Sequence, residues 1–373
     1  MRVVHLHEQF AELAGLPAEL PAGGFLWIST GRREFEVQLA ELQAALQRWG
    51  SGALVDLHVA DLLTNQLPSQ YDYTSWYDLL VFRRLAPGAG SSSLFVDGEH
   101  GTASTARQAL EAIDTSPVGF AVFDRVLLTV HPAECQVRDY FIGRLGQLGA
   151  PPAAAPEARI EAKAVAPRLP PSPADLMLRI VNHMVDGYLD LRRLLTRQLG
   201  YLQQELLNPR SRFDNWHALL DSRNALHQLE DTCEDQRSAI QEWIDALDEW
   251  PPETSKQGQR ERELLRVRSR DVLEHIERVL GHVRRLESSA ESAVQMHFSA
   301  LSHRTNDIMR TLTVLTAVFM PLNLITGFFG MNFDFLPLVH STTGIWVTTL
   351  LMAAVAIGLL VYFRRKRYLG RSR

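Results

Sequence analysis

The apolar and polar positions predict an α/β domain in residues 1–149. Short apolar runs bounded by turn residues are typical of strands, and the helical spacing of Leu39, Leu42 and Leu46 predicts a helix over 34–49. The predicted strands are 25–29, 53–59, 78–85, 93–96 and a hairpin of 119–123 with 126–130.

Residues 150–173 are rich in proline and alanine, which predicts a linker. At its end, Ser172 followed by Pro173 and Asp175 is typical of a helix start, with a hydroxyl cap and a carboxylate in the first turn. We expect two helices, over about 174–207 and 214–250, because Asn208-Pro209 and Pro251 interrupt the helical pattern. They are predicted to form an antiparallel hairpin over 174–250.

The longest predicted helix runs from about Lys256 to Phe329, with no strong helix breaker before Pro321. About 70 helical residues would extend ~105 Å at 1.5 Å per residue. Such a helix is too long for the core of a globular domain. We therefore predict a long helical stalk over 251–310 that continues into a membrane span.

Two runs of about 18 uncharged residues, 312–329 and 345–362, end the apolar pattern. Each is just long enough to cross a hydrocarbon layer of ~30 Å. A buried core helix is the alternative for one such run, but two adjacent runs favour membrane spans. We expect transmembrane helices at 311–330 and 344–363, joined by an external loop at 331–343.

Basic residues set the expected orientation. Arg304 and Arg310 precede the first span and a basic tail at 364–373 follows the second, whereas the connecting loop has no Lys or Arg. Positively charged flanks stay in the cytoplasm. The N-terminus shows no apolar signal region. We therefore expect a protein of the cell (inner) membrane and its lipid bilayer, with both termini cytoplasmic.

A heptad seam of small, polar and thioether residues runs along the stalk and first span. We call it the polar seam, and its members are Gly330, Gly327, Asn323, Met320, Thr316, Thr313, Met309, Asn306, Ser302, Ser299, Gln295, Ser292 and Ser288. Small and polar residues can hold transmembrane helices together. The alternative is a stripe that several copies present to a water-filled pore. The length of the seam favours the pore.

A pore lined by one such stripe per subunit requires a homo-oligomer around an axis. Between Thr311 and Asn332 there is no ionisable residue, so selectivity has to come from amide and carbonyl oxygens. The partially negative C-terminal end of the first span favours cations at the outer mouth. Gly330 allows the last turn to unwind at low strain and expose carbonyls. Neutral oxygens suit a hydrated ion such as Mg²⁺.

Composition argues against several other classes of protein. The formal net charge is -5, so no basic footprint for nucleic acid is present. Cys135 and Cys233 lack metal-site spacing and are expected to be free thiols packed as small hydrophobic groups. The chain has no P-loop, nucleophile elbow or metalloprotease motif. We therefore expect no enzymatic activity and no prosthetic group.

Residues 306–333, NDIMRTLTVLTAVFMPLNLITGFFGMNF, closely resemble the pore segment of the CorA-type divalent metal ion channels, in which Gly-Met-Asn ends the pore helix. The resemblance implies a homopentameric, funnel-shaped channel whose first span lines the pore. It implies a selectivity filter formed by Gly330, Met331 and Asn332. It also implies that some residues of the first span line or gate the pore. Together with members of the polar seam, the candidate pore-lining or gating residues are Asn306, Met309, Leu312, Thr313, Thr316, Met320, Asn323 and Gly327.

The family also places a regulatory carboxylate on the stalk, and the segment around Asp271 resembles that position. Asp271 is thus a candidate metal ligand, with a solvated surface residue as the alternative. Its partner carboxylate stays open among Asp97, Glu99 and Asp78. His275 lies four residues after Asp271 on the same helix face, which suits a softer ion such as Zn²⁺.

The identity of the ion stays open between Zn²⁺ and Mg²⁺, with Co²⁺ and Ni²⁺ as further candidates. The loop after Asn332 departs from the magnesium-type pattern because it lacks a glutamate, and this departure slightly favours a zinc-transporting branch. Asn323 stands where the family commonly has threonine. A membrane-tethered coiled-coil scaffold or sensor without transport is the rival function, but a scaffold would have apolar residues in the seam.

Overall fold

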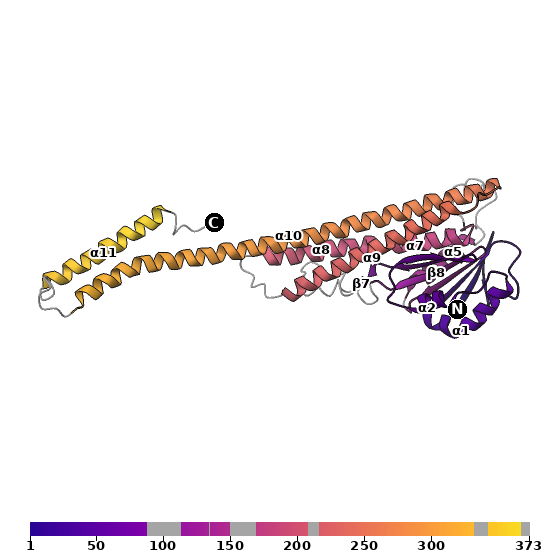
Figure 1. Ribbon diagram of the computed structural model, residues 1–373, viewed down its shortest axis with the longest axis horizontal. Helices are drawn as coiled ribbons and strands as arrows, with labels where there is room; N and C mark the ends of the chain where they lie inside the picture. Colours follow the sequence, from indigo (N-terminus) through magenta and orange to yellow (C-terminus); the bar gives the residue numbers. More distant parts are fainter. Residues whose placement is uncertain (88–112, 134, 150–168, 208–215, 332–341, 367–373) are drawn as a thin grey trace. The chain divides into compact units, whose positions relative to one another are not determined.

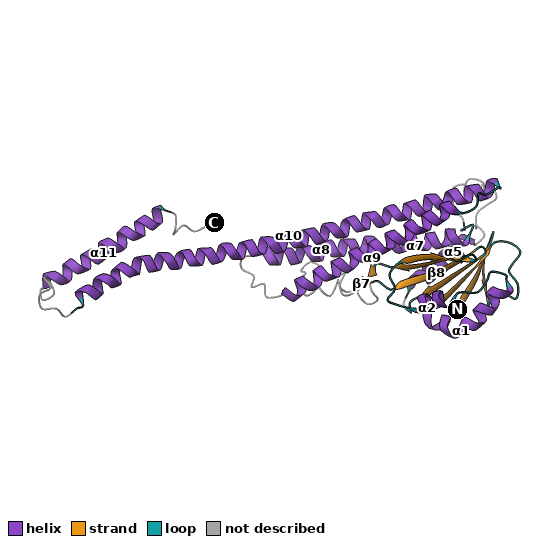
Figure 2. Ribbon diagram, in the orientation of Figure 1, coloured by secondary structure: helices purple, strands orange, loops and turns teal. Residues whose placement is uncertain are grey.

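The computed structural model describes residues 1–87, 113–133, 135–149, 169–207, 216–331 and 342–366. The chain divides into two compact units, Met1–Glu291 and Ser292–Arg373. The predicted strand at 93–96 lies outside the described residues, as does most of the predicted linker. Figures 1 and 2 show the helices and strands of each unit.

The first unit is built around a seven-stranded sheet with the order β2-β1-β3-β9-β8-β5-β4. Only the central pair β3 and β9 is parallel among the described strands, with Leu26 opposite Val126. A separate two-stranded ladder joins β6 to β7. The strands are β1 (Arg2–Leu6), β2 (Phe10–Leu13), β3 (Phe25–Gly31), β4 (Gln70–Tyr73), β5 (Tyr77–Arg83), β6 (Ala86–Pro87), β7 (Ile113–Asp114), β8 (Pro117–Phe123) and β9 (Val126–His131).

Helices cover both faces of this sheet, so its central strands are buried on both sides (Figure 1). α1 (Arg32–Arg48) and α2 (Asp56–Leu63) pack on one face, where Phe35, Leu42 and Leu62 join the main apolar core. α7 (Pro173–Asp186) contacts β3, β8 and β9, while α5 (Gln136–Gly149) contacts β2. A side chain at Gly119 would overlap Leu62, so glycine there allows α2 to approach β8 closely.

Several predicted elements are confirmed, and one is wrong. The strands at 25–29 and 78–85 appear as β3 and β5, and the hairpin of 119–123 with 126–130 appears as β8 and β9. Residues 53–59 do not form a strand, because α2 begins at Asp56 and buries Val59 and Leu62 on one helical face. The strand β1, the edge strands β2 and β4 and the helix α5 were not predicted.

Four long helices complete the chain: α8 (Tyr188–Leu207), α9 (Trp216–Glu249), α10 (Lys256–Phe329) and α11 (Thr342–Arg365). α9 contacts α10 through Trp243–Ser269 and, further along, through Glu230–Arg284, so these two helices run in opposite directions. α8 contacts α10 through Tyr188–His282 and Gln203–Ser289, which makes them parallel. It follows that α8 and α9 are antiparallel.

The second unit contains α10 from Ser292 onward and α11. Val314 and Val318 of α10 are buried, and Pro321 and Ile325 are half-buried on the same side of the helix. Half-buried positions of α11 recur every three to four residues, at Thr348, Met352, Val355, Leu359 and Phe363. Because these are the two described helices of this unit, we infer that the two stripes face each other.

Candidate ion pathway and metal sites

The polar seam is exposed along its whole length in the single chain. Every member from Ser288 to Gly330 is exposed, including Asn306 and Asn323. The stripe around Val314 and Val318 lies about half a turn away around α10, since residues advance by roughly 100° each. α10 thus carries one continuous polar stripe that is exposed among the described residues.

The threonines of the seam present their oxygens outward. The hydroxyl of Thr313 donates a hydrogen bond to the carbonyl of Met309 at 2.8 Å, and that of Thr316 donates to Leu312 at 2.9 Å. A hydroxyl that donates to the preceding turn keeps its lone pairs free to accept. At these two positions the exposed surface therefore offers hydrogen-bond acceptors, which suit a cation or the water molecules around it.

The predicted constriction residues are also exposed. Met309, Leu312 and Met320 expose 56%, 54% and 72% of their surface, respectively. Pro321 lies inside α10 and lacks the backbone N–H that would bond the carbonyl of Ala317. The assigned roles in pore lining and gating stay predictions.

The candidate filter lies at the end of α10. Gly330 does not unwind the last turn, because its N–H donates to the carbonyl of Thr326 at 2.9 Å. The N–H of Met331 then donates to the carbonyl of Phe328 at 3.4 Å, which forms a turn of three residues instead of four. The last carbonyls of a helix lack intrahelical donors, so acceptor oxygens gather here. Asn332, the third member of the predicted filter, lies outside the described residues.

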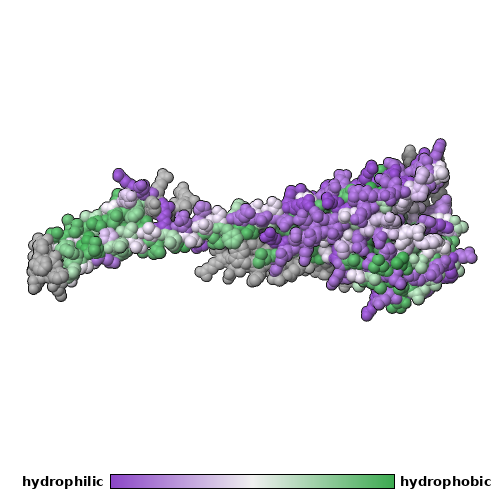
Figure 3. Space-filling model, in the orientation of Figure 1, coloured by the Kyte–Doolittle hydropathy of each residue, from purple (hydrophilic) through white to green (hydrophobic). Residues whose placement is uncertain are grey.

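Within the described residues, two helices are long and apolar enough to cross a membrane: α10, through its second half, and α11. Large apolar side chains on both are exposed, such as Leu324 (74%), Trp346 (77%) and Leu350 (75%). Figure 3 shows hydrophobic side chains gathered over α11 and the last part of α10, in contrast to the mostly hydrophilic helices of the first unit. Arg364 and Arg365 lie in the last turn of α11.

Asp271 and His275 lie on the same helix face, as their spacing predicted, and α7 places two further polar side chains next to His275. Asp271 Oδ1 lies 3.8 Å from His275 Nε2. Across the helix pair, His275 Nδ1 lies 3.1 Å from Asn182 Oδ1 and 3.3 Å from Asp186 Oδ1. A cavity of about 320 Å³ adjoins Asn182, Asp186 and Asp271. The sequence did not point to Asn182 and Asp186, because no local spacing links them to His275.

The three candidate partners of Asp271 are placed as follows. Asp97 and Glu99 lie outside the described residues. Asp78 lies on β5 and accepts a hydrogen bond from the Tyr71 hydroxyl at 2.7 Å. Burial raises the pKa of Asp78, and the pKa of Tyr71 also rises because of burial and this carboxylate. Asp78 is thus engaged inside the α/β part of its unit.

His282, on the same helix as His275, is buried between helices. It is 7% exposed, and its Nδ1 lies 2.7 Å from the Tyr188 hydroxyl. Nε2 lies 3.3 Å from the Thr196 hydroxyl, which itself donates to the carbonyl of Arg192. Burial, with Arg192 and Arg285 nearby, lowers the pKa of His282 to about 4. The side chain therefore links α8 to α10 as a neutral group.

An α/β unit that continues into two membrane-length helices defines an integral membrane protein. A family model described as "CorA-like Mg2+ transporter protein" matches residues 102–365, and the chain belongs to this family.

Curated relatives agree with this family. The cobalt/magnesium transport protein CorA of Thermotoga maritima is 25% identical over 198 residues, or 52% of this chain and 52% of that protein. The putative metal ion transporter YfjQ of Bacillus subtilis is 35% identical over 96 residues, which cover 26% of this chain and 30% of that protein. The chain thus spans about half the length of the first relative and less than a third of the second.

Solved structures agree with the fold over nearly the whole chain. The complete CorA magnesium transporter of Methanocaldococcus jannaschii has a TM-score of 0.67 at 18% identity, covering 98% of this chain and 97% of that one. The full-length CmaX protein has a TM-score of 0.56, also at 18% identity, with 98% and 96% covered. The predicted combination of an α/β domain, a long helix and two C-terminal apolar helices is therefore confirmed.

Proposed function

We propose that the protein is a divalent cation channel in which several copies of α10 line a central pore with their polar seams. One observation carries the proposal: the seam is exposed without interruption from Ser288 to Gly330, while Val314 and Val318 on the opposite side of α10 are buried. A helix that only anchors a scaffold gains nothing by keeping a polar stripe at membrane depth, since unpaired polar groups there are costly. A hydrated lumen removes that cost.

The chemistry of the lining favours a hydrated cation. Thr313 and Thr316 present acceptor oxygens, and the C-terminal end of α10 adds a partial negative charge. Acceptor oxygens can hold the water molecules of an ion without stripping them. We propose Gly330, Met331 and Asn332 as the filter, and Met309, Leu312 and Met320 as the constriction that closes when it loses water.

We further propose a homopentamer in the inner membrane with both termini in the cytoplasm. Family membership supports the assembly, and the basic residues that flank the two spans support the orientation. The curated relatives are described as transporters of magnesium and cobalt. We therefore place Mg²⁺ and Co²⁺ first as substrates, with Zn²⁺ as the alternative that the glutamate-free outer loop supports.

Reconstitution in liposomes tests this function directly. Uptake of Mg²⁺, Co²⁺, Ni²⁺ and Zn²⁺ is followed with ion-sensitive dyes for the wild type and for Asn332→Ala. We expect selective divalent flux in the wild type, and flux that is lost or unselective in Asn332→Ala with the oligomer intact. Preferred Zn²⁺ flux would assign the zinc branch. A well-formed oligomer that transports none of these ions would instead support the scaffold.

Asp271 is proposed to sense internal metal together with His275, Asn182 and Asp186. In the same liposomes, internal Mg²⁺ or Co²⁺ should reduce flux through the wild type, and Asp271→Asn should need more internal metal for the same block. Glu274→Gln, one turn away on the exposed face of α10, is the control. Identical block in Asp271→Asn would mean that Asp271 is a solvated surface residue and does not sense internal metal.

A further inference from the structure

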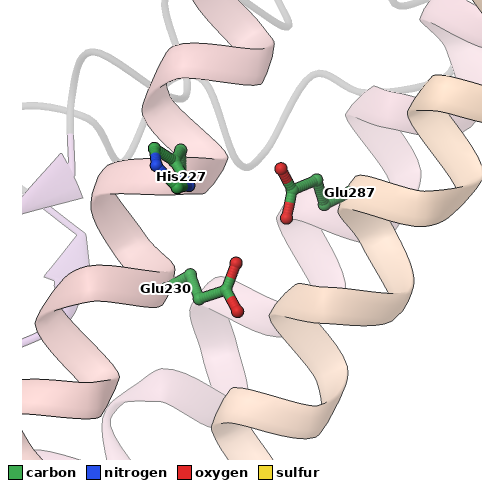
Figure 4. Close-up of side chains that lie close together, drawn as sticks. All are labelled: His227, Glu230 and Glu287. Carbon is green, nitrogen blue, oxygen red and sulfur yellow. The ribbon is translucent and has the colours of Figure 1, made fainter.

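A second cluster of ligating side chains joins α9 to α10 at a place separate from the polar seam and from Asp271. His227 and Glu230 lie on α9, and Glu287 lies on α10. One ligand atom from each of the three lies within 4.8 Å of the other two. Figure 4 shows Glu230 pointing from its helix toward α10 and Glu287 pointing back toward α9.

The spacing of these residues suits a metal site between helices. His227 and Glu230 are three residues apart, so they share one face of α9. A histidine and a glutamate at this spacing, facing a glutamate of a neighbouring helix, form the kind of ligand set that binds metal ions in helical bundles. The two helices are held together by Trp243–Ser269 on one side of the cluster and by the ion pair of Arg284 with Glu230 at the cluster itself.

The charges around the cluster leave it negative. Arg284 contacts Glu230 at 2.6 Å and also contacts Glu234, so one cation is shared between two carboxylates. Glu287 brings a third carboxylate to the same place, and Arg223 is a second cation near it, so two arginines face three carboxylates. Two facing carboxylates repel each other unless they share a proton or a cation lies between them, and a divalent cation bound there would compensate this excess.

We propose that His227, Glu230 and Glu287 form a transition-metal site that ties α9 to α10. One imidazole nitrogen and two carboxylate oxygens suit Zn²⁺, Co²⁺ or Ni²⁺ better than Mg²⁺, which prefers oxygen ligands and retains water. Metal–ligand bonds of about 2.0 to 2.2 Å place the ligand atoms of a tetrahedral ion roughly 3.3 to 3.6 Å apart. The side chains therefore need to close by only about 1.5 Å, which rotations of partly exposed residues allow. Water can complete the coordination.

Binding to the purified full-length chain tests the site without any measurement of transport. Co²⁺ is titrated into the protein in detergent and followed by its visible absorption and by calorimetry, because a bound imidazole changes the Co²⁺ spectrum. The wild type is compared with His227→Gln and Glu287→Gln. Glu291→Gln, an exposed glutamate one turn further along α10, is the matched control.

We expect His227→Gln and Glu287→Gln to lose one class of Co²⁺ site, or to bind it at least about tenfold more weakly, because even indirect contacts to a bound metal are worth that much. Glu291→Gln should titrate like the wild type, and equimolar Mg²⁺ should not compete. Added Co²⁺ should raise the melting temperature of the wild type and the control, but raise that of Glu287→Gln less.

Three outcomes would overturn the site: unchanged Co²⁺ titrations in both variants, an equal loss in Glu291→Gln, or displacement of Co²⁺ by equimolar Mg²⁺. Glu287→Gln keeps the size of the side chain, and its melting temperature without metal shows whether it folds. Other metal sites along the chain remain in all variants, so the comparison isolates this one. Because transport is not measured, failure here leaves the proposed channel untouched.

Discussion

At the scale of residues, buried polar side chains fasten the helices of the first unit to one another. The carboxylate of Asp175 at the start of α7 is 1% exposed and lies 2.8 Å from Arg179 and 2.6 Å from Arg268 of α10. Trp243 of α9 donates a hydrogen bond to Ser269 of α10, and both side chains are fully buried. Such groups are costly when one partner is removed, because the remaining charge or donor stays buried.

The first prediction concerns Asp175. Asp175→Ala leaves Arg179 and Arg268 facing each other without their carboxylate, and we expect the free energy of unfolding to fall by about 3 kcal/mol. Glu274→Ala, which removes an exposed ion pair with Arg278 at 3.2 Å, should cost about 0.5 kcal/mol or less. Denaturant unfolding of the full chain, followed by tryptophan fluorescence, measures both. Equal losses would mean that Asp175 contributes no more than a surface pair.

The second prediction concerns His282 and pH. Its pKa is lowered from 6.5 to about 4 by burial and by Arg192 and Arg285. The unfolded chain therefore binds a proton near pH 6.5 that the folded chain does not accept until about pH 4. The stability associated with His282 is complete above pH 6.5 and falls as the pH drops from 6.5 to 4.

Melting temperatures between pH 7 and pH 4.5 test this behaviour. His282→Gln keeps a group that can bond Tyr188 but cannot be protonated, so its melting temperature should fall less than that of the wild type. His303→Gln, at an exposed position of the same helix, should follow the wild type. Other buried histidines, such as His131, whose pKa is lowered to about 3, stay in every variant. Parallel curves for His282→Gln and the wild type would contradict the prediction.

At the scale of elements, α10 carries two different stripes, and a threonine can lie on or off the polar seam. Thr313 and Thr316 lie on the seam, whereas Thr311 lies off it. All three are exposed and donate their hydroxyl hydrogen to the preceding turn, Thr311 at 2.9 Å to Asp307. The three positions therefore differ in the direction they face, not in local structure.

The third prediction uses this difference. The double variant Thr313→Val with Thr316→Val keeps the shape of the seam but removes its acceptor oxygens. We expect the initial rate of divalent uptake to fall at least about tenfold, since a hydrogen bond to a charged species contributes about 1.5 kcal/mol or more. Thr311→Val should transport at the wild-type rate. Equal rates in the wild type, the double variant and Thr311→Val would mean that Thr313 and Thr316 do not line the ion pathway.

Elements with a long or strongly apolar pattern were predictable, and short ones were not. The spans, the long helix α10 and the β8–β9 hairpin follow directly from apolar periodicity and turn residues. Residues 53–59 alternate over too few positions to separate a strand from a helix, and tertiary packing selected a helix that exposes Leu57 and buries Val59. The candidate ligands on α7 and α9 could not be predicted, because only the fold brings Asp186 to His275 and Glu230 to Glu287.

At the scale of the whole molecule, the two units carry different surfaces. The first unit buries its apolar residues in the sheet and between the helices, whereas the second leaves large apolar side chains exposed on both α10 and α11. Exposed apolar surface of this extent is expected to be covered by lipid or by other subunits. The polar seam on the same helix requires a different environment, which the axis of the proposed oligomer would supply.

The fourth prediction follows from that axis. A cysteine at Thr316 should lie near its copies in neighbouring subunits, whereas a cysteine at Thr311 should face away from the axis. Background thiols interfere little, because Cys135 and Cys233 are buried and burial raises the pKa of Cys233 to about 12, which leaves almost no reactive thiolate. Treating Thr316→Cys in membranes with a short bis-maleimide should give a ladder of cross-linked species that ends at the pentamer, and Thr311→Cys should stay monomeric. A ladder that stops at the dimer would mean that the seam packs two helices together and does not line a pore. Equal ladders from both variants would mean that the seam does not face the axis.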